Sequence, residues 1–255
     1  MAGRLDSAAL VRCEPSKEHT AMTAWAERWL SVPRFAPYLG LCDGNTERAL
    51  ELYEWNVTLG QVLMRDILHF EVALRNACDC VMRRYWEGAG HWLLDENSPV
   101  VRPIIRLSKC KKPRDVNLVN RRAILESKDK AKDPADPDQV VAGLMLGFWT
   151  HLTDRSRERD LWIPYLHTAW PRGTDRADLV RSLTSINRVR NRMAHNERLF
   201  NPLKRVASVS QTDADILRLL RGLCPDAAEY LYGDGLRTPV ELFCKDHPAP
   251  AEVRL

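Results

Sequence analysis

One short segment of the chain combines residue types that suit cleavage of a phosphodiester bond. Residues 188–195 read Arg-Val-Arg-Asn-Arg-Met-Ala-His and place three arginines and one amide ahead of His195. Histidine transfers protons near neutral pH, and the planar guanidinium of arginine binds phosphate oxygens through permanent donors. The segment therefore supplies both groups that RNA cleavage needs when a ribose hydroxyl is the nucleophile, without a metal.

The spacing of these residues decides which of them share a helix face with His195. At about 100° per residue, Arg190 lies roughly 140° around the helix from His195. Arg188 and Arg192 lie much closer to the face of the histidine, and Asn191, four residues before it, shares that face. Geometry thus favours Arg188, and Arg190 acts with His195 only if the helix loosens near its end or if Arg190 reaches across a dimer interface.

The local charge favours an anionic partner. The whole chain of 255 residues has a formal net charge of only +4, but residues 181–205 hold seven basic residues against the single acid Glu197. This footprint is compatible with RNA. The alternative is that the arginines are solvated and that His195 caps the end of its helix, where a cation is favoured. In the first case we expect phosphate contacts from Arg181, Arg188, Arg192 and Arg198.

Helical periodicity predicts the elements that position the motif, and no alternating strand pattern is convincing. Cap residues at 43–47 precede an apolar pattern that predicts one long helix to about Tyr85, bent at Gly60. A core helix is expected over 139–152, and Thr174 or Asp175 opens the helix that carries the motif. Further helices are expected at 16–29, 34–41, 158–170 with a break at Pro164, 212–223 and 226–232.

These elements predict one all-α domain over residues 1–233, followed by a weakly ordered tail or appendage at 234–255. Within the domain, residues 87–137 are expected to form a mobile, loop-rich and basic insert with one or two shorter helices. The cations of this insert either contact RNA or form a solvated surface, and both interpretations remain open.

Composition excludes several other classes. No apolar run approaches the roughly 20 residues that span a bilayer, and charged residues interrupt any apolar core near the N-terminus, so we expect a cytoplasmic protein without a membrane partner. The seven cysteines are irregularly spaced with no C-x-x-C pair, which favours reduced thiols. No metal or cofactor is expected, because His69, His91, His151 and His167 lack a metal-like grouping.

Three separated segments, taken together and in order, resemble one protein family. They are Phe70-Glu71-Val72-Ala73-Leu74-Arg75-Asn76, Gly147-Phe148-Trp149 and residues 190–197, Arg-Asn-Arg-Met-Ala-His-Asn-Glu. They look like the bacterial abortive-infection (Abi-like) proteins of the HEPN superfamily, which contains all-helical ribonucleases and RNA-binding proteins. The resemblance covers roughly residues 30–205. It implies an HEPN-like helical bundle whose Arg-polar-x-x-x-His motif lies in a cleft, commonly completed by a second subunit.

The resemblance also implies roles for individual residues. Glu71 and Arg75 would lie near the catalytic helix as partly buried support, although their spacing also suits a plain surface ion pair. Asn191 would orient His195 or a phosphate by hydrogen bonding. The catalytic residues implied by the resemblance are Arg190, Asn191 and His195, and the supporting residues are Glu71, Arg75 and Asn76.

The expected function is a metal-independent endoribonuclease of bacterial phage defence, or a toxin, that works as a homodimer. Its expected partners are an RNA substrate and either a structured noncoding RNA or an antitoxin. Some HEPN toxins carry a modifiable tyrosine two residues after the motif histidine, but this chain has Glu197, so neutralisation by that route is not expected. The alternatives are a noncatalytic RNA-binding protein with the same basic cleft and a helical adaptor for a protein partner.

Overall fold

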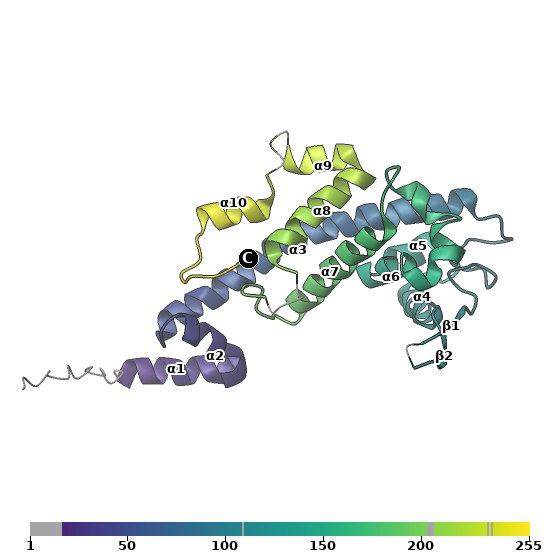
Figure 1. The fold of residues 1–255 in the computed structure, drawn as a ribbon. Helices are drawn as coiled ribbons and strands as arrows, with labels where there is room; N and C mark the ends of the chain where they lie inside the picture. The colour runs from purple at the N-terminus through teal and green to yellow at the C-terminus, as the bar shows by residue number, and fades with distance from the viewer. Residues whose placement is uncertain (1–16, 109, 203–206, 234, 236) are drawn as a thin grey trace, which may run out of the picture. The chain divides into compact units, whose positions relative to one another are not determined.

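The computed structural model describes residues 17–108, 110–202, 207–233, 235 and 237–255. Over these residues the chain is all-α, as its periodicity predicts, apart from one small antiparallel pair of strands (Figure 1). Among the described residues, no helix is both long enough and apolar enough to cross a membrane.

The chain forms two compact units, and the boundary between them falls within one long helix, after Trp55. The first unit includes α1 (Lys17–Leu30), α2 (Val32–Leu41) and the start of α3 (Thr46–Tyr85). Its aromatic centre is formed around Tyr53, whose ring meets those of Trp29 and Tyr38 edge-on at centroid distances of 5.6 Å.

The second unit contains the rest of α3 and the motif. Along α3, apolar residues recur every three or four positions, so that one face of the helix is buried continuously. The fully buried residues of this stripe are Leu59, Leu63, Ile67, Phe70, Leu74 and Cys78. In Figure 1, α7 (Arg176–Ala194) and α8 (Val209–Leu223) lie along this part of α3.

Gly60 has a packing role in α3. The 40 residues of α3 form one continuous helix, which confirms the predicted long element. A Cβ atom at Gly60 would lie 3.4 Å from Cδ1 of Leu199 and 3.8 Å from Cγ of Met193. The missing side chain therefore lets the end of α7 and the segment after it approach the backbone of α3.

The prediction of one core helix over residues 139–152 was wrong. The segment forms α5 (Pro137–Gly143) and α6 (Leu146–Leu152), because Leu144 and Met145 between them adopt extended backbone angles, with ψ of 134° and 164°. A local hydrogen bond spans this break: the carbonyl of Leu144 accepts from Nε1 of Trp149 at 3.4 Å. The break also leaves the N–H of Leu146 available to a side chain of α3, described below.

The expected absence of strands needs correction, and the insert is partly packed. The insert contains a hairpin of β1 (Ile105–Leu107) and β2 (Pro113–Asp115) and one helix, α4 (Leu118–Lys130). Strands of three residues are too short to show an alternating pattern. Large side chains of the insert are buried, among them Trp92, Leu93, Val100, Ile104 and Ile124.

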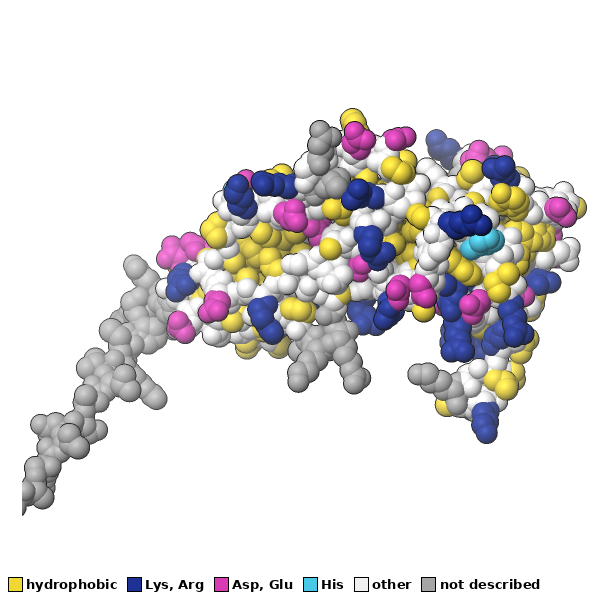
Figure 2. All heavy atoms as spheres, turned by 45° about the horizontal axis from the view of Figure 1, so that its top comes forward, with side chains coloured by type: hydrophobic (Ala, Val, Ile, Leu, Met, Phe, Trp, Pro, Cys, Tyr) yellow, Lys and Arg dark blue, Asp and Glu magenta, His cyan; other side chains and the backbone are white. Residues whose placement is uncertain are grey.

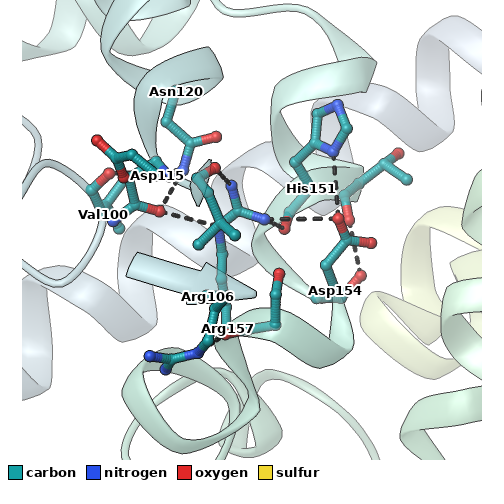
Figure 3. Close-up of polar contacts among 12 residues, drawn as sticks. Val100, Arg106, Asp115, Asn120, His151, Asp154 and Arg157 are labelled. Carbon is teal, nitrogen blue, oxygen red and sulfur yellow. Dashed lines mark hydrogen bonds and ion pairs between the residues drawn. The ribbon is translucent and has the colours of Figure 1, made fainter. Parts of the chain in front are cut away.

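A buried arginine joins this insert to the segment after α6. Arg157, in the helical turn η1 (Arg155–Arg157), is 2% exposed. Its Nε donates to Oδ1 of Asn117 at 3.0 Å, and its guanidinium also donates to the carbonyls of His151 and Val116 (Figure 3). A buried guanidinium is tolerated only when it is hydrogen-bonded in this way, so the network holds the insert in place.

The remaining elements complete the second unit. The expected helices at 212–223 and 226–232 are confirmed as α8 and α9 (Pro225–Tyr232). The region expected to be a weakly ordered tail contains α10 (Pro239–Asp246), whose N-terminus has a capping box formed by Thr238 and Glu241. The segment 158–170 forms two short turns, η2 (Glu158–Trp162) and η3 (Leu166–Ala169), on either side of the predicted break at Pro164.

Candidate active site

The motif lies at the C-terminal end of α7. The helix begins at Arg176 with Asp175 as its cap, and its buried stripe includes Leu183, Ile186 and Val189. It ends at Ala194, so that His195 is the C-terminal cap residue, with φ −100° and ψ 10°. His195 is therefore exposed at the point where the helix ends rather than on a continuing helical face.

The turn after His195 has the geometry of a helix C-terminus closed by a left-handed residue. Asn196 has a φ of +51°, a region that asparagine tolerates better than most residues. Its N–H donates to the carbonyl of Met193 at 2.9 Å, and the N–H of Glu197 donates to that of Arg192 at 2.9 Å. The helical hydrogen bonding therefore continues to His195, whose N–H donates to the carbonyl of Asn191 at 3.2 Å, and the chain turns away only after it.

Arg190 lies beside Glu71, which α3 supplies. Glu71 is partly buried, and burial raises its pKa above the ordinary value. Three groups oppose that rise: the charge of Arg190, a hydrogen bond from the backbone N–H of Leu146, and the charge of Arg75. The structure thus brings Arg190 of α7 near Glu71 and Arg75, which both lie on α3.

Arg75 also fixes the neighbouring backbone. Its Nη1 donates to the carbonyl of Ala142 at 3.0 Å, near the break between α5 and α6. Asn76, the third supporting residue expected on α3, is exposed. Glu71 and Arg75 therefore hold the break beside α7, whereas Asn76 faces solvent.

The arginines of the motif have different surroundings. Arg188 is exposed and forms no ion pair with any described residue, whereas Arg190 is half-buried and donates to Oδ1 of Asn191 at 3.4 Å. The guanidinium of Arg192 bonds to Glu197, with Nε 3.2 Å from Oε2, and to the carbonyl of Arg198. Arg192 thus holds the turn after the helix.

The two outer arginines expected to contact RNA also have partners within the chain. Arg181 forms an ion pair with Asp178 one turn earlier on α7. The guanidinium of Arg198 lies over the ring of Phe200, 5.5 Å from its centroid. Both contacts are at the surface, where such interactions contribute little free energy and can be exchanged for a ligand.

Asn56 on α3 is a contributor to the site that sequence reasoning missed. It is 3% exposed, its Oδ1 accepts from the N–H of Leu199 at 2.8 Å, and its Nδ2 donates to the carbonyl of Glu197 at 3.5 Å. It therefore fastens the segment after the motif to α3. An amide within the apolar stripe of the long helix is the sequence signal that could have identified it.

A cavity of about 430 Å³ lies next to this fastening. Its walls come from α3, from Met193 at the end of α7, and from the segment after it, including Asn196 and Glu197. His195, Arg190 and Asn191 do not line it. The motif histidine thus lies on the surface next to a cavity rather than inside one. The other residues that line the cavity include Asn56, Gly60, Gln61, Met64, Arg65 and Leu68.

Metal-binding groups are not found in the part of the chain that the structure describes. No cluster there brings together three histidine, cysteine, aspartate or glutamate side chains that could hold an ion. Comparison with known proteins finds no matching family model, no matching curated protein and no matching solved structure.

Proposed function

We propose that this chain is a cytoplasmic, metal-independent endoribonuclease, with His195 as a general acid or base, that acts in bacterial phage defence or as a toxin. The observation that carries the proposal is the exposure of His195 at the end of α7, next to a helix turn that presents Arg188 and Asn191 to solvent. This arrangement leaves a proton-transfer group and phosphate-binding donors open to a large substrate.

The proposed reaction needs no group beyond these side chains and a second acid or base. A base removes the proton of the ribose 2′-hydroxyl, and the oxygen attacks the adjacent phosphorus in line. The bond from phosphorus to the 5′ oxygen breaks, an acid protonates that oxygen, and a 2′,3′-cyclic phosphate remains. Arginines stabilise the charge that builds on the phosphoryl oxygens. His195 performs one proton transfer, and His195 of a second copy supplies the other.

Glu71 has a positioning role in this proposal. Its negative charge favours a guanidinium at Arg190, with which it interacts electrostatically, while exposed Arg188 is left for the substrate phosphate. The resemblance to Abi-like HEPN proteins supports Arg190, and exposure supports Arg188. Comparing their substitutions decides which guanidinium acts on the phosphate.

A specific observation also favours noncatalytic RNA binding. Two of the three motif arginines have an acidic neighbour within the chain: Arg192 forms an ion pair with Glu197, and Arg190 interacts electrostatically with Glu71. Catalysis needs an arginine near His195 that is available to the reacting phosphate. RNA binding alone needs only cations at the surface. Purified protein that retains RNA and never cleaves it would establish this second function.

The test uses one labelled RNA and a twin that is methylated at the scissile 2′ oxygen. With EDTA in excess, the unmodified strand should be cut and should end in a cyclic phosphate, while the twin should stay intact, because it lacks the nucleophile. Cleavage of the methylated strand would reject the mechanism, since it requires attack by water instead.

A further inference from the structure

The hairpin of the insert presents arginines opposite one another. In the register of β1 and β2, Arg106 pairs directly with Arg114, and both are exposed. Like charges directly opposite each other across a strand pair are destabilising. Within the protein, Asp160 offsets the charge of Arg106, whereas Arg114 has no acidic partner among the described residues.

Tertiary contacts fix this hairpin firmly. The carboxylate of Asp115 accepts from the N–H groups of Ile104 and Asn117, both at 3.0 Å, and pairs with Arg121. Arg106 donates to the carbonyl of Ser156 at 3.2 Å. An isolated two-stranded hairpin is only marginally stable, so these anchors are what hold the opposed arginines in position.

The negative charge near the hairpin does not balance the arginines. Asp160 forms ion pairs with two of them, Arg106 at 2.6 Å and Arg102 at 3.2 Å. Arg114 forms no ion pair within the described part of the chain, and its charge, after burial, contributes to the lowered pKa of Arg157.

Further cations lie around the hairpin. Figure 2 shows Lys and Arg side chains gathered around the hairpin, at the lower right of that view. Several are exposed and form no ion pair with any residue the structure describes, which leaves them open to an external anion. These exposed cations are Lys111, Lys112, Arg114 and Arg122.

We propose that this hairpin surface, defined by Arg102, Arg106 and Arg114, binds the phosphate backbone of the RNA that the motif on α7 acts on. The inference rests on the proposed function and adds a second contact that holds the RNA away from the cleavage point. A phosphate at this surface would be bound by Arg114, which has no ion-pair partner among the described residues, and by Arg106, which shares Asp160 with Arg102.

The alternation of side chains favours RNA over a lipid surface as the partner. Ile105 and Leu107 are 57% and 73% exposed, but they point to the opposite face of the ribbon from Arg106. An anionic membrane would require apolar and basic side chains to meet it from the same side. A phosphate backbone requires only the arginine face.

Equilibrium binding with a salt series tests this inference. All variants carry His195→Ala, which avoids cleavage. One double variant combines Arg106→Gln and Arg114→Gln in the hairpin. The control double variant combines Arg84→Gln and Arg221→Gln, at two exposed arginines on α3 and α8. The probe is a fluorescein-labelled RNA stem-loop measured by anisotropy. The hairpin pair should weaken binding about tenfold or more, and the slope of log affinity against log salt should fall by about 1.4 to 1.8, as expected for two lost phosphate contacts.

The outcomes separate the inference from the proposed function. Equal affinities and equal slopes for the two pairs overturn the inference, even if the unsubstituted protein cleaves the RNA. Loss of binding to phosphatidylserine vesicles with unchanged RNA binding also overturns it and assigns the surface to a membrane. Wild-type cleavage by His195→Ala rejects the proposed function, whereas the binding comparison still decides the role of the hairpin.

A measurement on the unsubstituted hairpin covers the case in which the double variant fails to fold. Cys110 lies in the turn between β1 and β2, and Cys80 lies on α3, and both are exposed. Bound RNA should slow the alkylation of Cys110 by iodoacetamide several-fold and leave Cys80 as the internal reference. Alkylation of Cys110 at the same rate with and without saturating RNA contradicts the inference.

Discussion

Arg190 on α7 lies beside Glu71 on α3, and the charge of the arginine opposes the rise in pKa that burial imposes on the carboxyl group. The pair connects the motif to the long helix. It also places a negative charge next to one of the arginines that the sequence offers for phosphate binding. The free energy of this contact, and its effect on cleavage, can be measured separately.

A double-mutant cycle should detect the contact. Glu71→Gln and Arg190→Ala should show a coupling free energy of about 0.2 to 1 kcal/mol in urea unfolding, because each substitution removes the same electrostatic interaction. The matched cycle with Arg188→Ala should show almost no coupling, since Arg188 is exposed and forms no ion pair within the described residues. Equal coupling free energies in the two cycles would show that Glu71 has no specific interaction with Arg190.

His195→Ala should abolish RNA cleavage without unfolding the protein. General acid or base catalysis typically contributes about 100-fold to 10,000-fold, and an exposed residue at a helix end changes the free energy of unfolding by less than about 1 kcal/mol. His69→Ala, another exposed histidine, serves as the control and should cleave normally. Cleavage by His195→Ala at the wild-type rate excludes His195 as the catalytic group.

Asn56→Ala should destabilise the protein far more than a neighbouring substitution. Removing the amide leaves the buried N–H of Leu199 without its 2.8 Å acceptor, which costs about 1 to 3 kcal/mol. Gln61→Ala, an exposed change at the same cavity, should shift the free energy of unfolding by less than about 0.5 kcal/mol. Similar urea midpoints for the two variants would refute this role of Asn56.

Asp213 on α8 should make stability depend on pH. Burial raises its pKa to about 6, with Asp66 and Glu241 adding to the rise, while a hydrogen bond from Thr238 opposes it. A raised pKa means that folding favours the protonated form, so the contribution of Asp213 to stability is present below the unfolded value of 3.8 and is lost as the pH rises through about 6.

The variant Asp213→Asn isolates this effect, because its side chain stays neutral at every pH. Relative to the wild type, the variant should gain about 2 to 3 kcal/mol in free energy of unfolding between pH 4 and pH 7. Asp178→Asn, at an exposed carboxylate of α7, should show no comparable gain. A difference between Asp213→Asn and wild type that does not change with pH would contradict the raised pKa.

The proposed reaction also predicts a homodimer. One His195 supplies one proton transfer, so a second copy must bring the complementary group to a shared groove. Specific activity should fall on dilution as the dimer dissociates, and light scattering should detect the dimer at concentrations where the enzyme is active. Full activity from a strict monomer would require a different second group.

The sequence by itself determined the long helix, the motif helix and the all-α class. Apolar residues that recur with the helical period, together with caps such as Asp175, are local signals, and they predict an element wherever no tertiary contact overrides them. The same local signals identified His195 and its arginines as candidates for chemistry, because residue type and spacing need no knowledge of packing.

Only the tertiary structure decided which of those candidates meet. Glu71 and Arg190 are distant in sequence and come together because α3 and α7 pack side by side. The break at Leu144 is held from α3, where Glu71 accepts from the N–H of Leu146 and Arg75 donates to the carbonyl of Ala142, and helical periodicity cannot predict such long-range bonds. Strands of three residues exist only because tertiary bonds hold them, so a local pattern could not predict the hairpin.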